Sequence, residues 1–293
     1  MLEMRNVTKS FGSVRALDNL SLTVPRGAVY GLVGPNGAGK STAIRHMLGI
    51  YRPDSGRVTM EGMEVFENPV MKSRMCAIGD EVFFFPSATL TDMARFYRGI
   101  YKGFDMALFE RLQDVFELPR KSPIRRFSEG MQKQAAFQLS LAARPEMLVL
   151  DEPLDGLDPV MRRQVCSIIL SDVAQNGTTV LISSHNLREL EDVCDHVGIM
   201  DKGRMLMERS LMDMQGSTHK VQLAGEIPEG LDILHIAESG RLKTLIVRGS
   251  AEAISAKVAS AQPAYFDVLP LSLEEIFIYE LGGVDNAVKN IVL

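Results

Sequence analysis

The sequence predicts an α/β protein built on a mostly parallel sheet and followed by a small α+β region. Residues 34–42 fit the pattern G-x-x-x-x-G-K-[ST] and lie between an apolar run and a helical one. Residues 147–150 are apolar throughout, as expected of a strand covered on both faces, and end in Asp151-Glu152. Residues 83–144 have helical spacing instead, so we expect a helical subdomain inserted into the core.

The loop after the first apolar run has the composition of a phosphate-binding loop. Gly34, Gly37 and Gly39 let successive backbone N–H groups turn toward a phosphate, and the next helix adds its positive N-terminal end. Lys40 can reach the β- and γ-phosphates of a nucleotide, and the hydroxyl of Ser41 can hold Mg²⁺. An ordinary glycine-rich turn is the alternative, which the strand and helix on either side disfavour. The expected nucleotide-binding residues here are Gly34, Asn36, Gly37, Ala38, Gly39, Lys40, Ser41 and Thr42.

The segment before the loop reads as a separate small sheet. Residues 1–33 alternate apolar and polar positions in short runs, with turns at Gly12-Ser13 and at 25–27. This pattern predicts mostly antiparallel strands that lead into the strand before the loop. Phe11, at the first turn, either packs against this sheet or stacks on an adenine ring.

Helical and strand patterns then alternate along the chain. In order, we expect helices at 90–101, 106–116 and 128–143, a strand at 147–150, a helix at 159–176, a strand at 178–182, a helix at 186–193 and a strand at 197–200. Asp201-Lys202-Gly203 has the composition of a hairpin turn. The core should therefore resume its parallel sheet after the helical block.

The last part of the chain differs in charge from the rest. Residues 217–293 hold 6 Lys and Arg against 10 Asp and Glu, a net of −4, whereas the preceding residues are close to neutral. We therefore expect domains at 1–213 and 214–293, the second a small α+β domain. It should contain strands at 221–223, 244–247 and 266–269, a helix at 251–261, and a last helix with Ser272 and Glu275 as a capping box.

Composition limits the class of protein. The 293 residues are 46% hydrophobic and 24% charged, as in ordinary soluble proteins, and no uncharged apolar run reaches the ~18 residues that span a bilayer. The N-terminus lacks the apolar segment of a signal peptide, so we expect a cytoplasmic chain. A net charge of −5 disfavours a nucleic-acid partner. The three cysteines have no metal-binding spacing and are expected to be buried thiols.

Two adjacent carboxylates follow the buried strand at 147–150. Asp151, at the end of this strand, can hold Mg²⁺ directly or through water. Glu152 can orient an attacking water or accept its proton. Acidic residues also cap strands and helices, but a phosphate-binding loop upstream favours the catalytic interpretation.

These motifs and their order resemble the ATP-binding cassette (ABC) ATPases over about residues 1–210. Residues 126–134 lie where that family has its signature motif, usually Leu-Ser-Gly-Gly-Gln, which Ser128 and Gly130 match and Phe127, Glu129 and Met131 do not. In the family the signature serine and glycine contact the γ-phosphate bound by the opposite subunit. The resemblance therefore implies a dimer, of identical or different chains, around two ATP molecules.

Other positions extend this resemblance. Leu157-Asp158 resembles the family's D-loop, and His185 resembles its switch histidine, which contacts the γ-phosphate. The opening strands resemble the family's as well, and support Phe11 as the aromatic residue that stacks on adenine. The resemblance implies an ATP hydrolase whose catalytic residues are Lys40, Glu152 and His185.

One family position is irregular, because the region of the Q-loop contains no glutamine. It reads Ile78-Gly79-Asp80-Glu81-Val82-Phe83. Glu81 is the best placed substitute and Asp80 the next, and either carboxylate could bind Mg²⁺ or water. Ser41, Asp151 and Glu81 are thus the expected ligands of Mg²⁺.

The resemblance implies a subunit that powers a transporter through separate permease chains. We expect it at the inner face of the membrane, driving export, with residues 83–85 and the helical subdomain contacting the permease; these phenylalanines could instead pack the subdomain. The alternative is a soluble ABC-type ATPase in regulation, DNA repair or translation. The C-terminal domain could support the dimer or cover the edge of the core.

Overall fold

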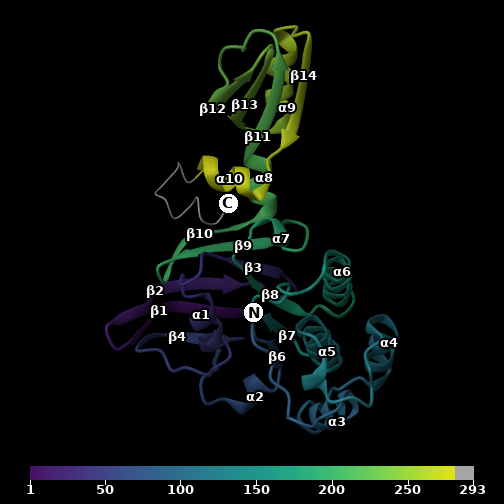
Figure 1. The fold of residues 1–293 in the computed structure, drawn as a ribbon. Helices are drawn as coiled ribbons and strands as arrows, with labels where there is room; N and C mark the ends of the chain where they lie inside the picture. The colour runs from purple at the N-terminus through teal and green to yellow at the C-terminus, as the bar shows by residue number, and fades with distance from the viewer. Residues whose placement is uncertain (281–293) are drawn as a thin grey trace. The chain divides into compact units, whose positions relative to one another are not determined.

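The structure is a computed structural model that describes residues 1–280, and it divides into two compact units (Figure 1). Unit 1 comprises Met1–His185 and His196–Glu208, and unit 2 comprises Asn186–Asp195 and the chain from Arg209 onward. The chain therefore enters unit 2 twice, first directly after His185. Within residues 1–280, no helix is both long and apolar enough to cross a membrane.

Unit 1 begins with an antiparallel sheet of four strands in the order β2-β1-β4-β5. The strands are β1 (Leu2–Phe11), β2 (Val14–Val24), β4 (Ser55–Met60) and β5 (Met63–Glu64). Glu61 and Gly62 join the last two with φ values of 52° and 77°, the left-handed pair that a tight hairpin turn requires. The small sheet expected before the phosphate loop is confirmed, with two later strands added to it.

The second sheet of unit 1 has six strands in the order β10-β9-β3-β8-β7-β6. These are β3 (Val29–Val33), β6 (Met75–Ile78), β7 (Met147–Leu150), β8 (Thr179–Ser184), β9 (His196–Asp201) and β10 (Arg204–Ser210). Strand β3 is parallel to β8 and β9, and β7 is parallel to β6 and β8. Because Val33 pairs with Ser184 and Leu150 with Ile182, the segments that follow these strands meet at one edge.

Helices complete unit 1. Helices α1 (Lys40–Met47), α2 (Pro69–Lys72) and α6 (Pro159–Asn176) belong to the core, where buried side chains of both sheets and of α1 form one cluster. The inserted subdomain contains α3 (Leu90–Ile100), α4 (Met106–Phe116), the 3₁₀ turn η1 (Ile124–Arg126) and α5 (Glu129–Ala142). Thr89, Asp105 and Ser128 cap its three α-helices with their side chains. The predicted helical block between 83 and 144 is thus confirmed.

Unit 2 is an antiparallel sheet with helices. Its strands β11 (Thr218–Ala224), β12 (Asp232–Ser239), β13 (Leu242–Arg248) and β14 (Tyr265–Pro270) have the order β12-β13-β11-β14. Helices α7 (Arg188–Glu191), α8 (Leu211–Ser217), α9 (Ala251–Ser260) and α10 (Leu273–Glu280) complete it. Buried residues of β11, β13 and α9 form its hydrophobic core. Strand β12 was not expected, because its half-exposed residues give no continuous apolar run.

Helix α7 is shorter than predicted, and it packs on α10 within unit 2. Arg188 forms an ion pair with Glu274 at 2.8 Å, and the Leu273 N–H donates to Glu191 at 3.0 Å. The expected capping box is present: Glu275 N–H donates to the Ser272 hydroxyl, and Ser272 N–H to the Glu275 carboxylate. Unit 2 thus includes the segment Asn186–Asp195, which carries α7, and resumes at Arg209. The expected boundary at 213/214 is a division of the sequence and does not coincide with this division into compact units.

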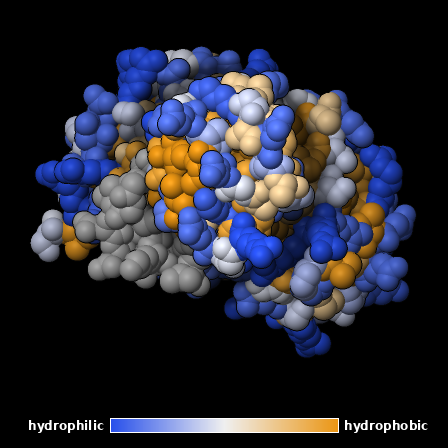
Figure 2. Space-filling view, turned by 90° about the horizontal axis from the view of Figure 1, so that it is seen from above, coloured by the Kyte–Doolittle hydropathy of each residue, from blue (hydrophilic) through white to orange (hydrophobic). Residues whose placement is uncertain are grey.

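The surface drawn in Figure 2 mixes hydrophobic and hydrophilic residues. Exposed large hydrophobic residues of unit 2 are spread over different elements: Met212, Ile236, Tyr265 and Ile278. Scattered exposure of this kind is ordinary on a protein surface. More closely grouped exposed aromatics lie in unit 1, just before and within α3, at Phe83, Phe85 and Phe96.

Candidate nucleotide-binding site

The loop between β3 and α1 has the conformation of a phosphate cradle. Gly37 and Gly39 have φ values of 83° and 102°, which disfavour residues with side chains. A Cβ at Gly39 would lie 2.6 Å from the carbonyl oxygen of Ala16, and one at Gly34 would collide with the carbonyl oxygen of Met200. The glycine positions therefore follow from close backbone approach, and they let the chain turn directly into the N-terminus of α1.

Lys40 opens α1 and is almost fully buried. Its ammonium donates to the carbonyl oxygen of Gly34 at 2.6 Å and forms an ion pair with Glu152 at 3.0 Å. The first N–H groups of a helix have no acceptor within the helix and carry its positive dipole end. The loop therefore combines backbone donors with one buried cation, which is a suitable environment for phosphate.

The segment after β7 is fixed by a serine of β8. The hydroxyl of Ser183 donates to the carboxylate of Asp151 at 2.7 Å and accepts the N–H of Glu152 at 2.9 Å. Asp151 is buried, with 7% of its surface exposed, and Glu152 has a φ of 46°. A positive φ is unusual for a residue with a side chain and indicates that surrounding contacts determine the conformation.

The carboxylate of Glu152 brings the three predicted catalytic residues together. One oxygen lies 3.0 Å from Lys40 Nζ, and the other lies 3.1 Å from His185 Nδ1 and accepts the backbone N–H of His185 at 3.3 Å. Glu152 thus occupies the space between the cation of the phosphate loop and the histidine that follows β8. A phosphate oxygen bound to Lys40 would share its ammonium with this carboxylate or take the place of it.

A pocket of about 450 Å³ lies at the loop. It is lined by Val14, Arg15, Ala16, residues 35–42, Asp80, Glu152 and Lys202. Asp80 and Glu81 are both exposed, but of the two only Asp80 is among these lining residues. Partial burial raises the pKa of Asp80, and the positive charge of Lys133 opposes this effect. The negative charges of Asp151, Asp155 and Glu152 raise the pKa further. Asp80 thus lies at the pocket, and Glu81 as a ligand of Mg²⁺ stays a prediction.

Phe11 is half-exposed and packs edge-on against Tyr51, with ring centroids 5.4 Å apart. The ammonium of Lys9 lies 5.6 Å from the Phe11 ring centroid. The wall of the pocket near this turn is formed instead by Val14, Arg15 and Ala16. Stacking of Phe11 on adenine accordingly stays a prediction.

Comparisons with known proteins agree on one family. The ABC transporter family matches residues 17–155. The ABC transporter ATP-binding protein YtrB of Bacillus subtilis is 31% identical over 288 residues, which cover 97% of this chain and 99% of the relative. The chain belongs to the ABC transporter ATP-binding proteins. It is an ABC-type ATPase, and it binds ATP.

Two further likenesses concern the whole chain and the fold. The daunorubicin resistance ATP-binding protein DrrA3 of Streptomyces coeruleorubidus is 31% identical, with 96% of this chain and 95% of the relative covered. A solved ATP-binding subunit of an ABC transporter superposes with a TM-score of 0.68 at 27% identity, covering 73% of this chain and 92% of that one. The α/β cassette expected from the sequence is confirmed.

The segment expected to be the signature motif lies at the start of α5. Ser128 is exposed, and its hydroxyl accepts the N–H of Met131 at 3.3 Å as the N-cap. Gly130 lies against the D-loop, since a Cβ there would come within 3.0 Å of the Gly156 carbonyl oxygen. Neither Ser128 nor Gly130 is among the residues that line the pocket of their own chain.

Sequence reasoning missed two residues of the ABC site. Lys133 is fully buried on α5, and its ammonium donates to the carbonyl oxygen of Glu152 at 3.1 Å. Asp155 offers a carboxylate oxygen near Glu152 and His185, with one polar atom of each within 4.8 Å of the others. The position of Lys133 among the apolar residues of a helix could have pointed to it. Nothing in the sequence singles out Asp155, because acidic residues are common in loops.

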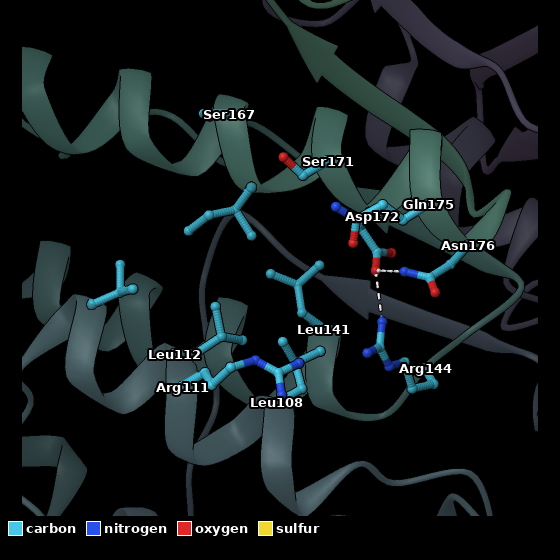
Figure 3. A pocket seen from close by; sticks show the side chains of 12 residues that line it. Leu108, Arg111, Leu112, Leu141, Arg144, Ser167, Ser171, Asp172, Gln175 and Asn176 are labelled. Atoms are coloured by element: carbon cyan, nitrogen blue, oxygen red, sulfur yellow. Dashed lines mark hydrogen bonds and ion pairs between the residues drawn. The ribbon is translucent and has the colours of Figure 1, made fainter.

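A second pocket, of about 250 Å³, lies between the helical subdomain and α6 (Figure 3). Arg144 bridges the two sides. It forms an ion pair with Asp172 of α6 at 3.0 Å, drawn in Figure 3, and another with Asp105, the N-cap of α4, at 2.9 Å. Asp172 also accepts from Asn176 at 2.7 Å. These bonds join the subdomain to the ABC core, and none of the residues lining the nucleotide pocket takes part in them.

Proposed function

We propose that this ABC ATPase hydrolyses ATP to drive a transporter whose membrane-spanning part is a separate permease chain, with export as the direction. The observation that carries the hydrolytic part is the position of the Glu152 carboxylate between Lys40 and His185. The transport part rests on the relatives, one named as an ABC transporter protein and another for daunorubicin resistance. Such a subunit works at the inner face of the membrane.

The phosphate loop binds the substrate. Its N–H groups and the N-terminus of α1 hold the β- and γ-phosphates, and Lys40 offsets their charge. The oxygens of Ser41, Asp151 and Asp80 suit Mg²⁺, which prefers oxygen ligands. Asp80 lines the pocket, and the neighbouring Glu81 is the other candidate for this ligand. Bound Mg²⁺ would supply further neutralisation of the phosphate charge.

Glu152 acts on the attacking water once its bond to Lys40 is exchanged for a phosphate contact. Its carboxylate then orients the water or accepts its proton. His185 Nδ1 lies 3.1 Å from the same carboxylate, and in this scheme its side chain donates to the γ-phosphate. Hydrolysis in this scheme depends on placement and charge more than on covalent chemistry.

A second cassette completes the site. Ser128 and Gly130 are accessible, stand at the start of α5, and lie outside the pocket of their own chain. We propose that they close over the ATP of a partner cassette, identical or different, and that its signature segment closes over this one. The C-terminal domain, residues 214–293, supports that dimer.

Exposed phenylalanines are the proposed contact for the permease. Phe83 and Phe85 are 79% and 45% exposed, and Phe96 of α3 packs edge-on against Phe85 at 5.1 Å. Phe84, in contrast, is 4% exposed and packs inside. Exposed aromatic groups of this kind mark interaction surfaces.

Affinity purification of the tagged chain from detergent-solubilised membranes tests the transport proposal. A protein with several membrane spans should co-purify, and the double change Phe83→Ser and Phe85→Ser should reduce its yield. Val70→Ser, at a position 65% exposed on α2, is the matched control and should leave the yield unchanged. Recovery with ribosomes or nucleic acid and no membrane protein would favour the soluble ATPase instead.

A further inference from the structure

The fully buried lysine of α5 has no role in the scheme above. Lys133 is 0% exposed, and its ammonium donates to the backbone carbonyl oxygen of Glu152 at 3.1 Å. Burial of an ammonium is costly, and a hydrophobic residue of similar volume would avoid that cost. Its charge also acts on Asp80, whose pKa it lowers against the effect of burial. A buried cation bonded to the Glu152 backbone therefore calls for a functional reason.

The backbone of Glu152 is held on both sides. Its N–H donates to the Ser183 hydroxyl at 2.9 Å, and its carbonyl oxygen accepts from Lys133. Its φ of 46° is a conformation that persists only where the surroundings impose it. Ser183 comes from β8 and Lys133 from α5, so two separate elements fix one peptide.

We propose that Lys133 is a positioning residue for ATP hydrolysis: by fixing the Glu152 carbonyl it sets where the Glu152 carboxylate lies. The inference rests on the proposed catalytic role of Glu152. In this backbone conformation the carboxylate lies 3.0 Å from Lys40 Nζ and 3.1 Å from His185 Nδ1. Rotation of the peptide would move the carboxylate away from both groups.

Lys133 also connects two parts of the site. Ser128 is the N-cap of α5, and Lys133 lies in the second turn of the same helix. A shift of α5 when the signature segment engages a partner cassette would therefore pull on the Glu152 carbonyl. The lysine thus couples the position of the signature helix to the carboxylate of its own site.

Steady-state ATP turnover by the full chain tests this role through Lys133→Met, which keeps the volume and removes the donor. We expect kcat to fall by roughly 10²-fold while KM for ATP stays within about twofold, since a small misplacement of a catalytic group affects chemistry more than binding. Lys133→Arg, which keeps a charged donor, should recover most of kcat. If Lys133→Met does not fold, Lys133→Gln replaces it, with an intermediate kcat expected.

Gln138→Met is the matched control. Gln138 is equally buried on α5 and also donates to a backbone carbonyl, that of Phe109 at 2.8 Å, within the helical subdomain. It should lower Tm without a selective loss of kcat. Equal losses of kcat in both variants, or unchanged kcat in Lys133→Met, would overturn the inference. Glu152→Gln in the same assay separates the two proposals: if it retains turnover, the catalytic role of Glu152 itself fails.

Discussion

The phosphate loop and the Asp151-Glu152 segment each follow a buried parallel strand, yet they are held in different ways. The loop is shaped by its own glycines, whose φ values and close backbone contacts determine its path. The acidic segment is shaped by other elements: Ser183 of β8, Lys133 of α5, Lys40 of α1 and the residue after β8, His185. One is a local backbone structure, and the other is a tertiary arrangement of side chains.

This difference shows how the two halves of the site should respond to change. A backbone cradle tolerates no added side chain at its tight glycines but depends little on distant residues. The Glu152 carboxylate depends on contacts from several separate elements, so loss of any one of them should displace it to a degree set by that contact. Substitutions in the loop should therefore weaken ATP binding, whereas substitutions in the acidic segment should mainly lower turnover.

Lys40→Ala should have the largest effect. It removes the one buried cation of the loop, so ATP hydrolysis should fall by about 10³-fold or more, with weakened ATP binding. Phosphate release and nucleotide titration measure the two losses. Lys102→Ala, at an exposed position after α3, is the control and should match the unaltered chain. Undiminished hydrolysis by Lys40→Ala would refute the phosphate-loop assignment.

Glu152→Gln should lower turnover by about 10²–10³-fold while ATP binding persists, because the amide cannot accept the proton of water. It also removes the negative partner of Lys40, so binding should not weaken. Size-exclusion chromatography with ATP should reveal a stable dimer. Glu110→Gln breaks only an exposed ion pair on α4 and serves as the control. Near-normal turnover in Glu152→Gln would remove Glu152 from the mechanism.

Gly39→Ala tests the backbone origin of the loop. A Cβ there would lie 2.6 Å from the Ala16 carbonyl oxygen at a φ of 102°, so we expect a loss of about 1–3 kcal/mol in stability and roughly tenfold weaker ATP binding. Gly62→Ala is the matched control: its φ is 77° but no atom lies within 4 Å. It should lose stability alone, as measured by thermal unfolding. Equal nucleotide affinity in both variants would contradict a locally built cradle.

Ser183→Ala should have the smallest effect. It leaves the Glu152 N–H and one Asp151 oxygen without their serine partner, which costs about 1–3 kcal/mol. Turnover should drop several-fold with ATP binding retained, since Lys133 still holds the Glu152 carbonyl. Ser73→Ala, which removes an exposed hydroxyl bond to Val70, should change neither quantity. Loss of ATP binding in Ser183→Ala would contradict the comparison, because it would show that the acidic segment is required for binding as well as for turnover.

Several features of this protein could be predicted from local sequence. The spacing of Gly34, Gly39 and Lys40 determines the loop, and the caps at Ser128 and Ser272 determine where helices begin. These are interactions between neighbours in the chain, with fixed geometry for a given residue order. The strand before Asp151 was equally clear, because a strand covered on both faces must be apolar throughout.

Other features were decided by tertiary structure. The sequence favoured Glu81 over Asp80 as the ligand of Mg²⁺, and only the tertiary structure shows that Asp80 is the one lining the pocket. The sequence also could not separate the buried Phe84 from the exposed Phe83. It also gave no role to Lys133, whose partner is distant in sequence. Which side chains of a short segment face the core depends on the elements packed against that segment. The role of a buried lysine can be inferred only when the acceptor of its ammonium is known. Sequence alone determined the ABC family and the phosphate loop, and tertiary packing decided how Glu152 is held.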